Sequence, residues 1–338
     1  MNRSTFFHGI LSVPFVLVFV ALLVPQTAGA EEIWAASNHI RVFDLETGTP
    51  IAVMPLERHI RDIQFNNEGT LAFVGASNGL HIADVRQHRL IEHSFEGSQV
   101  LALDAHGDVL VMLTWPDKSS RAQSDDTAPN SLGSVSFLKR STGSLIRQFV
   151  IPGRPLDVLM SPDGLGAVVA DQNGHTLRYF NLEGTNLWSI DVIQADKNSA
   201  SSLERRGTTI VFATLHQDES LLHRIDWNGS RVGDPIRVPG GQRIRVLAGS
   251  SATNDLWLMS MDTLYRLNSR DVLEGATNFD ITYTHASQIP GSQLLILSAI
   301  TFDSEKNAGG LSVVSHRGEV LRSVVLPSMS PYFTVVYP

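Results

Sequence analysis

The segment IPGRPLDVLMSPDGLGAVVA, residues 151–170, decides the fold of this chain. Two apolar runs lie on either side of the tetrapeptide Ser161-Pro162-Asp163-Gly164. Proline presets the first dihedral angle of a turn, and glycine adopts the positive φ that closes it. The segment therefore predicts a β-hairpin of two short strands.

Similar hairpins recur along the chain, each followed by two further short strands. Residues 61–76 repeat the pattern around a turn at residues 66–69, and residues 100–108 repeat it around a turn at residues 105–108. The additional pairs of strands surround glycine-containing turns at residues 46–48, 141–143, 183–184, 228–229 and 317–318. Short strands separated by such turns indicate an all-β fold.

The second strand of each hairpin recurs with a period of roughly 40 residues, which is the length of a four-stranded propeller blade. These second strands are expected to begin at Ile33, Leu71, Val109, Leu165, Ile210, Leu256 and Leu294. One longer interval contains a polar insertion at residues 116–132, and a second long connection is expected at residues 299–310. The period predicts a single seven-bladed β-propeller over residues 31–338.

The two ends of this propeller complement one another. Residues 33–36 form a second strand that lacks an inner partner, and residues 331–337 form an inner strand that lacks the rest of its blade. Pairing these strands closes the ring and removes two sheet edges that would otherwise promote aggregation. We therefore predict that the N-terminal and C-terminal strands share one blade.

Two segments carry a resemblance to a known repeat. Residues 152–170 contain the motifs Pro-Gly-x-Pro and Ser-Pro-Asp-Gly, and residues 42–48 read VFDLETG. These motifs resemble the YVTN repeat of the WD40-like β-propellers, although the nearest matches to Tyr-Val-Thr-Asn itself are AASN at residues 35–38 and GASN at residues 75–78. The resemblance covers nearly all of residues 31–338. It implies a fold and no single activity, since the superfamily includes lactonases, amine-dehydrogenase heavy chains, surface-layer proteins and binding scaffolds.

Residues 1–30 show the three parts of a secretory signal peptide. Arg3 and polar residues precede an apolar run from Ile10 to Val24, and Ala28-Gly29-Ala30 places small residues before a cut at Glu31. The apolar run is shorter than the roughly 20 residues that span a bilayer, which favours cleavage over an uncleaved anchor. We expect a periplasmic or secreted protein with no membrane span after cleavage.

Composition excludes several kinds of function. The formal net charge of −8 becomes one unit more negative once Arg3 is removed, and an acidic protein is not expected to bind nucleic acid or anionic membranes. The chain has no cysteine, which excludes disulfides and cysteine catalysis. No histidines are spaced as metal ligands, and His81 and His223 are interpreted as a repeated surface position. We predict no metal, no cofactor and no recognisable catalytic group.

Cations gather where an outer strand leads to the next inner strand. They are Arg58, His59, Arg61, Arg154, Lys197, Arg243, Arg245 and His285. In a propeller these connections lie on one face, so Arg61, Arg154, Arg243 and Arg245 are candidate ligands for a carboxylate or phosphate at the channel mouth. The alternative is a solvated salt-bridge network with Glu57, Asp62, Asp157, Asp191 and Asp196.

Two aspartates occupy matching positions early in their inner strands. Asp62 and Asp157 are candidates to reach the central channel and contact a ligand there. The alternative is that each carboxylate accepts hydrogen bonds from nearby backbone N–H groups. We favour the second interpretation, because short acidic side chains commonly bond the backbone near them.

Two function classes are compatible with this pattern. The first is a noncatalytic scaffold that binds a protein partner or a small anionic ligand on one loop-rich face, since long loops on a rigid scaffold are the usual place for recognition. The second is a propeller enzyme or enzyme subunit that resembles the lactonases or the amine-dehydrogenase heavy chains. A meeting of Asp62, Asp157 and a histidine within hydrogen-bond reach would favour the enzyme.

Overall fold

The computed structural model describes residues 32–116, 132–171, 176–191, 203–216, 219–238, 244, 246–249, 254–260, 262–289, 292–303, 308–326, 331 and 333–337. Over these ranges the chain forms strands and no helix. No membrane-spanning helix is found in the same ranges. The predicted signal peptide at residues 1–30 lies outside them, as do residues 117–131 of the predicted polar insertion.

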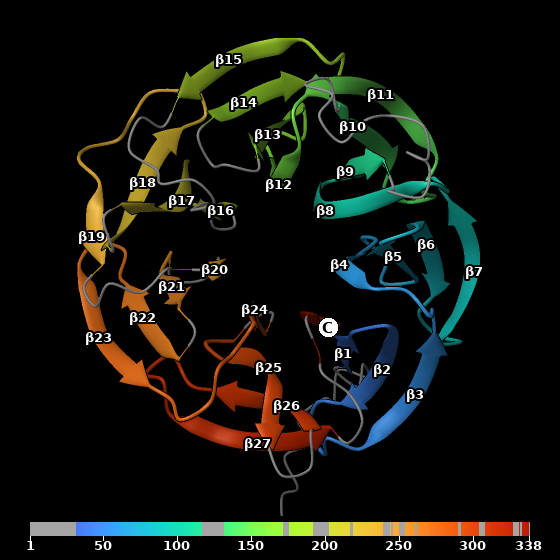
Figure 1. Ribbon diagram of the computed structural model, residues 1–338, viewed down its shortest axis with the longest axis vertical. Helices are drawn as coiled ribbons and strands as arrows, with labels where there is room; N and C mark the ends of the chain where they lie inside the picture. Colours follow the sequence, from blue (N-terminus) through green and yellow to red (C-terminus); the bar gives the residue numbers. More distant parts are fainter. Residues whose placement is uncertain are drawn as a thin grey trace, which may run out of the picture.

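Seven antiparallel sheets of four strands each surround a common axis, and each sheet is one blade (Figure 1). From the axis outward, blade one contains β28 (Phe333–Tyr337), β1 (Glu32–Ala36), β2 (His39–Asp44) and β3 (Pro50–Pro55). Blade two contains β4 (Ile60–Phe65), β5 (Leu71–Ala76), β6 (Gly79–Asp84) and β7 (Arg89–Ser94). Blade three contains β8 (Ser98–His106), β9 (Val109–Pro116), β10 (Leu132–Lys139) and β11 (Leu145–Pro152).

The remaining four blades follow the same order. Blade four contains β12 (Pro155–Met160), β13 (Gly166–Asp171), β14 (Thr176–Asn181) and β15 (Asn186–Asp191). Blade five contains β16 (Leu203–Arg206), β17 (Thr209–His216), β18 (Glu219–Asp226) and β19 (Ile236–Val238). Blade six contains β20 (Val246–Gly249), β21 (Leu256–Met259), β22 (Thr263–Leu267) and β23 (Leu273–Asn278). Blade seven contains β24 (His285–Gln288), β25 (Leu295–Asp303), β26 (Ala308–Val314) and β27 (Val320–Leu326).

The predicted seven-bladed, all-β propeller is therefore confirmed. The second strands β1, β5, β9, β13, β17, β21 and β25 each begin at the predicted residue or one residue away from it. Ring closure is confirmed as well, because β28 pairs antiparallel with β1, with Ile33 opposite Val336 and Ala35 opposite Thr334. The first and last strands of the propeller thus complete one blade.

Two strand boundaries differ from the sequence prediction. A strand is expected directly after the turn at residues 228–229, but β19 begins only at Ile236, because Gly233 has a φ of +68° and Pro235 has no N–H to give to the ladder. The long connection expected at residues 299–310 is mostly strand, since β25 continues to Asp303 and β26 begins at Ala308.

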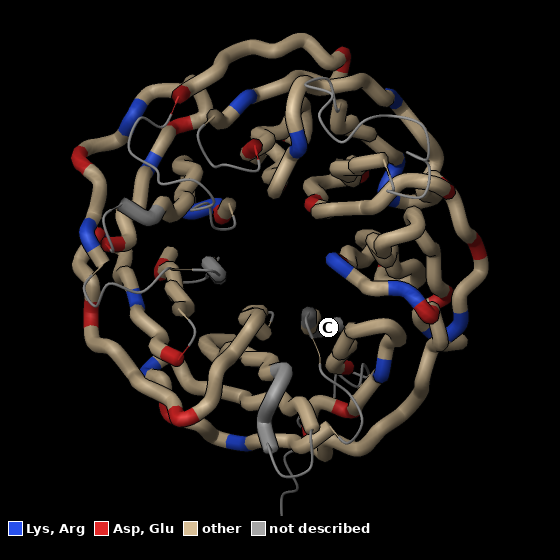
Figure 2. Tube along the Cα trace, viewed as in Figure 1, with Lys and Arg blue, Asp and Glu red and all other residues tan. Residues whose placement is uncertain are grey.

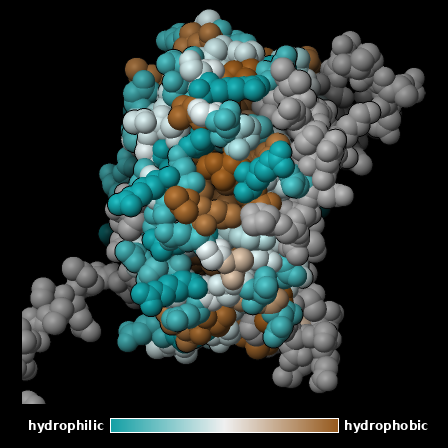
Figure 3. All heavy atoms as spheres, turned by 90° about the vertical axis from the view of Figure 1, so that its left-hand side faces the viewer, coloured by the Kyte–Doolittle hydropathy of each residue, from teal (hydrophilic) through white to brown (hydrophobic). Residues whose placement is uncertain are grey.

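The hydrophobic core is divided among the blade interfaces. Within the described residues, seven buried clusters each join two neighbouring blades. Trp34 of blade one, for example, is fully buried and packs edge-on against Phe65 of blade two. Apolar residues also remain on the rim, as at Val53 and Leu187. On the face that Figure 3 shows, hydrophobic residues form small groups among hydrophilic ones.

Candidate functional site

A polar cavity of about 490 Å³ lies on the propeller axis. Its lining comes from the innermost strands of all seven blades, from β4 to β28. Acidic positions lie on the inner strands β8, β12 and β16, whereas β24 carries none (Figure 2). The lining residues that the sequence prediction named are Arg61, Asp62, Asp157 and His285.

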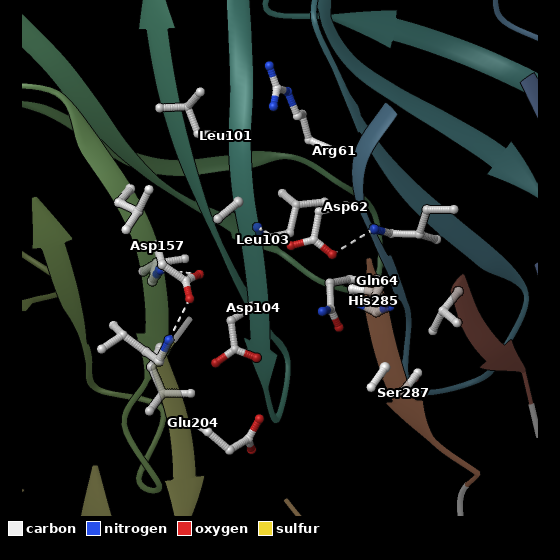
Figure 4. Close-up of a pocket in the computed structure, with 18 of the residues that line it drawn as sticks. Arg61, Asp62, Gln64, Leu101, Leu103, Asp104, Asp157, Glu204, His285 and Ser287 are labelled. Atoms are coloured by element: carbon white, nitrogen blue, oxygen red, sulfur yellow. Dashed lines mark hydrogen bonds between the residues drawn. The ribbon is translucent and has the colours of Figure 1, made fainter. Parts of the chain in front are cut away.

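Four carboxyl groups line this cavity, on four consecutive blades. Asp62 lies on β4, Asp104 on β8, Asp157 on β12 and Glu204 on β16. Figure 4 shows Asp62 and Asp157 at one level, with Asp104 and Glu204 further along the axis and Arg61 at the opposite end. The acidic groups therefore alternate between two levels around one arc of the ring.

Three of the carboxylates connect their own blade to the next one. Asp62 accepts the backbone N–H of Leu103 at 2.8 Å, and Asp104 accepts that of Met160 at 2.6 Å. Asp157 accepts the N–H of Leu203 at 2.6 Å. Each bond crosses from one inner strand to its neighbour in the ring, so the carboxylates join blades two, three, four and five.

Asp62 and Asp157 also bond within their own strands. Asp62 accepts the N–H of Ile63 at 2.7 Å, and Asp157 accepts that of Val158 at 2.8 Å. Backbone bonding was the favoured interpretation of these two residues, and the structure adds the bond to the neighbouring blade. Both aspartates also line the cavity, so the two interpretations are compatible.

At blade six, the described residue that lines the cavity is a glycine and not a carboxyl group. Gly249 of β20 lies beside Glu204, where an added Cβ would be 2.9 Å from Glu204 Oε1 and 3.0 Å from the Arg205 carbonyl oxygen. At blade seven the corresponding link is made by a histidine, because His285 Nδ1 accepts the N–H of Thr334 at 3.4 Å. Burial lowers the pKa of His285 to about 4, so its imidazole is neutral at physiological pH.

Burial raises the pKa of each carboxyl group in the cavity. The pKa of Asp157 rises to about 6 and that of Glu204 to about 8. The pKa of Asp62 is raised well above its ordinary value by burial and further by the charge of Asp157, while the backbone hydrogen bonds oppose the shift. Burial also raises the pKa of Asp104. At neutral pH the cavity therefore retains protons, and some of these groups can donate as well as accept hydrogen bonds.

Two arginines from different blades lie near each other: Arg61 is on β4, and Arg154 directly precedes β12. Arg61 is exposed at the mouth, yet partial desolvation and then the charge of Arg154 lower its pKa. The guanidinium of Arg154 lies 5.9 Å from the ring centre of Trp115, a cation–π distance that holds the side chain over the ring. Among the described residues, neither arginine forms an ion pair. Two positive charges, Arg61 and Arg154, thus lie near one another, and Arg61 lines the cavity.

The predicted site residues are only partly placed together. Arg61, Asp62 and Asp157 line the cavity, and Arg154 is near enough to Arg61 for its charge to lower the pKa of Arg61, whereas Arg243 and Arg245 lie outside the described residues. The prediction did not name Asp104 or Glu204. Asp104 is the single charged residue of 100–105, which is a signal that could have identified it, whereas 203–206 reads LERR and does not distinguish Glu204.

The prediction that His81 and His223 occupy a repeated surface position is wrong. Both are buried, with relative exposures of 7% and 8%, and not on the surface. His81 stacks on His93 at 4.1 Å, and His223 stacks on Phe212 at 5.0 Å. Each histidine lies in the third strand of its blade and stacks on a ring of an adjacent strand in the same blade. This packing buries both side chains.

No protein-family model matches this chain, and no curated protein matches it. The YVTN resemblance therefore stays a prediction. Solved structures match in fold. One is a protein of unknown function from Desulfotomaculum acetoxidans DSM 771, with a TM-score of 0.68 and 11% identity over 91% of this chain and 99% of the other.

Two further structures have the same architecture. The dihydro-heme d1 dehydrogenase NirN in complex with DHE matches with a TM-score of 0.58 and 13% identity, over 90% of this chain and 75% of that one. A chain of the mitotic checkpoint complex matches with a TM-score of 0.60 and 12% identity, over 79% of this chain and 84% of that one. Identities this low support the propeller fold alone, since one fold hosts many functions.

Proposed function

We propose that this protein is a noncatalytic propeller that binds a small acidic molecule in its axial cavity. One observation carries the proposal: Arg61, which the charge of Arg154 reaches, lies at one end of the cavity, and Asp104 and Glu204 lie toward the other (Figure 4). Such an arrangement suits a ligand with an acidic group at one end and hydrogen-bond donors at the other. Amino acids and hydroxy acids have this form.

The sequence predicts a small anionic ligand, and the charged residues of the cavity favour one kind of anion over others. A guanidinium binds carboxylate or phosphate through two parallel hydrogen bonds, so an acidic group is expected beside Arg61. A polyanion such as citrate would also place charge near the carboxylates of Asp62 and Asp157, which like-charge repulsion opposes. An ammonium or hydroxyl group near Asp104 and Glu204 would instead donate to their oxygens. A protein that inserts an acidic side chain into the mouth is the second form of the same proposal.

The enzyme alternative has one observation in its favour. Carboxyl groups with raised pKa values, such as Glu204, act as general acids when they lie in a cavity. Against it, Asp62 and Asp157 both bond backbone amides, and His285 accepts from Thr334. These bonds give the polar groups a structural role, which favours the binding scaffold.

The site can be tested by calorimetry on the purified full chain. We expect serine or lactate to bind more tightly than citrate or phosphate at matched ionic strength. Arg61→Gln and Arg154→Gln should each weaken that binding about tenfold. Arg237→Gln is the matched control, since this exposed arginine pairs with the exposed Glu219 on the rim. Failure of every compound to bind, or equal affinity in Arg61→Gln, would refute the proposal.

Export belongs to the same proposal and rests on residues 1–30. We propose that the chain is cleaved before Glu31 and acts in the periplasm or outside the cell. Mass measurement of the exported protein is expected to give a chain that begins at Glu31. A chain that retains Met1 would contradict this part of the proposal and leave the ligand site untouched.

A further inference from the structure

We propose that the ligand of the axial cavity is an ω-amino acid, whose carboxylate binds at Arg61 and whose ammonium group binds at Asp104 and Glu204. The inference rests on the proposed function and narrows its ligand to zwitterions in which several carbon atoms separate the two charges. Two observations carry it. They are the hydrogen bonds that the carboxyl groups of the cavity already make and the levels at which these groups lie along the axis.

Glu204 differs from the other three carboxyl groups of the cavity in its hydrogen bonds. Each of the others accepts a backbone N–H from the next inner strand. Within the described part of the chain, the bond to Glu204 comes from the N–H of Arg205 on its own strand, at 3.1 Å to Oε1. Its neighbour on the next inner strand is Gly249, which has no side chain that could donate. The second oxygen of Glu204, Oε2, can therefore accept a hydrogen bond from a ligand in the cavity.

The acidic end of the cavity lies several ångströms along the axis from the arginine. Asp157 accepts the N–H of Val158, and Asp104 accepts the N–H of Met160, two residues later on the same strand, β12. Two residues of a β-strand rise about 7 Å, so the levels of these two carboxyl groups differ by roughly that distance. Arg61 lies at the opposite end from Asp104 (Figure 4). An α-amino acid, whose two charges are one carbon atom apart, is too short to reach both ends.

The charges around Glu204 favour an ammonium group over a hydroxyl at this end. Two neighbouring inner strands bring acidic groups toward it, Asp104 on β8 and Asp157 on β12, while Arg205 on its own strand and Gly249 on β20 complete its surroundings. Burial and then the charge of Asp104 raise the pKa of Glu204 to about 8, and Arg205 opposes the shift. A bound ammonium group adds the positive charge that favours the ionised carboxylate, and it has three N–H groups to donate. Binding should therefore transfer the proton of Glu204 to the solvent.

The probe for this inference is 5-aminovalerate, in which a chain of methylene groups separates the carboxylate from the ammonium group. Serine carries its ammonium group next to the carboxylate, and valerate has the same carbon chain as the probe without an ammonium group. We expect calorimetry on the purified full chain at neutral pH to show about tenfold tighter binding of 5-aminovalerate than of either compound. Serine tests whether the separation of the charges matters, and valerate tests whether the ammonium group matters.

The released proton gives a second readout, measured by repeating the titration in two buffers that differ in ionisation enthalpy. We expect roughly one proton to be released for each 5-aminovalerate bound at neutral pH and almost none for valerate. Glu204→Gln cannot ionise, so it should release almost no proton and bind 5-aminovalerate about tenfold more weakly, while its affinity for valerate stays that of the wild type. Arg237→Gln, on the rim, should leave every value unchanged.

The outcomes separate this inference from the proposed function. If serine binds and 5-aminovalerate binds no more tightly, or binds without releasing a proton, the inference is overturned and the proposed function stands. Equal proton release by the wild type and Glu204→Gln would also overturn it, because the proton would then come from another group. If none of these compounds binds, both the inference and the proposed function are wrong.

Discussion

The two arcs of the inner ring are held together differently. In blades two to five, Asp62, Asp104 and Asp157 each accept a backbone N–H from the next inner strand. In blades six, seven and one, no described carboxylate lines the cavity, and the ring is closed by Gly249 beside Glu204, by His285 and by the pairing of β28 with β1. Neighbouring inner strands can thus be joined by buried polar bonds or by other contacts, and among the described residues the carboxyl groups that line the cavity all lie in blades two to five.

Deleting residues 331–338 should have the largest effect on this comparison, because it removes the strand that closes the second arc. β1 would lose its partner and expose an edge to other chains. We expect aggregation or loss of cooperative unfolding in urea. Asp157→Ala, which alters the first arc alone, should still unfold cooperatively. A truncated chain with the midpoint and slope of the full chain would contradict the role given to closure.

Removing one carboxylate of the polar arc should have the next largest effect. Asp157→Ala leaves the N–H groups of Val158 and Leu203 without their acceptor, which should cost about 2 kcal/mol of unfolding free energy. Ser287→Ala is the matched control, since Ser287 lines the same cavity on blade seven, and its cost should be about 0.5 kcal/mol or less. Equal costs in urea denaturation would show that the arcs do not differ in this way.

The pH dependence of stability should identify Glu204 as the most strongly shifted of the groups with a stated pKa. Its pKa of about 8 in the folded chain lies above the ordinary value of 4.5. The stability that its neutral form contributes is therefore fully present below about pH 4.5 and is lost as the pH rises through 8. Glu204→Gln cannot ionise, so its stability relative to the wild type should rise by about 1.4 kcal/mol per pH unit between about pH 5 and pH 8.

Histidine 285 does not disturb this measurement. Its pKa is lowered to about 4, so its contribution to stability is lost as the pH falls from 6.5 toward 4, and it is common to both proteins. The difference between the two proteins isolates residue 204. Parallel stability curves for wild type and Glu204→Gln across this range would contradict the assignment.

The junction between the arcs should give the smallest effect. Gly249→Ala places a methyl group 2.9 Å from Glu204 Oε1 and 3.0 Å from the Arg205 carbonyl oxygen. The carboxylate can move aside and the backbone oxygen cannot, so we expect a loss of about 1 kcal/mol. In a double-mutant cycle, Glu204→Ala should remove part of this loss but not all of it. Strict additivity of the two substitutions would show that Gly249 does not accommodate Glu204.

Two of the four carboxyl groups of the candidate site could be predicted from sequence, because the same β-bulge recurs in their inner strands. The strand register shifts just before Asp62 in blade two and just before Asp157 in blade four, which gives the two aspartates matching positions. In blade three the same shift occurs before Ala102, so Asp104 reaches the cavity two residues later and at a different level. Aligning the starts of the inner strands therefore does not identify Asp104, although it accepts a backbone N–H from the next blade as Asp62 and Asp157 do.

The number of blades, the turns that separate their strands and the pairing of the two ends could be predicted from the sequence. These features depend on local signals. They are the proline and glycine positions in turns such as residues 161–164 and a repeat whose length matches a four-stranded blade. The long-range packing of the strands places Asp62, Asp104, Asp157 and Glu204 around the axis and brings Arg154 near Arg61. Those outcomes depend on contacts between residues that are far apart in the chain, where a shift of one residue in a strand turns a side chain to the opposite face.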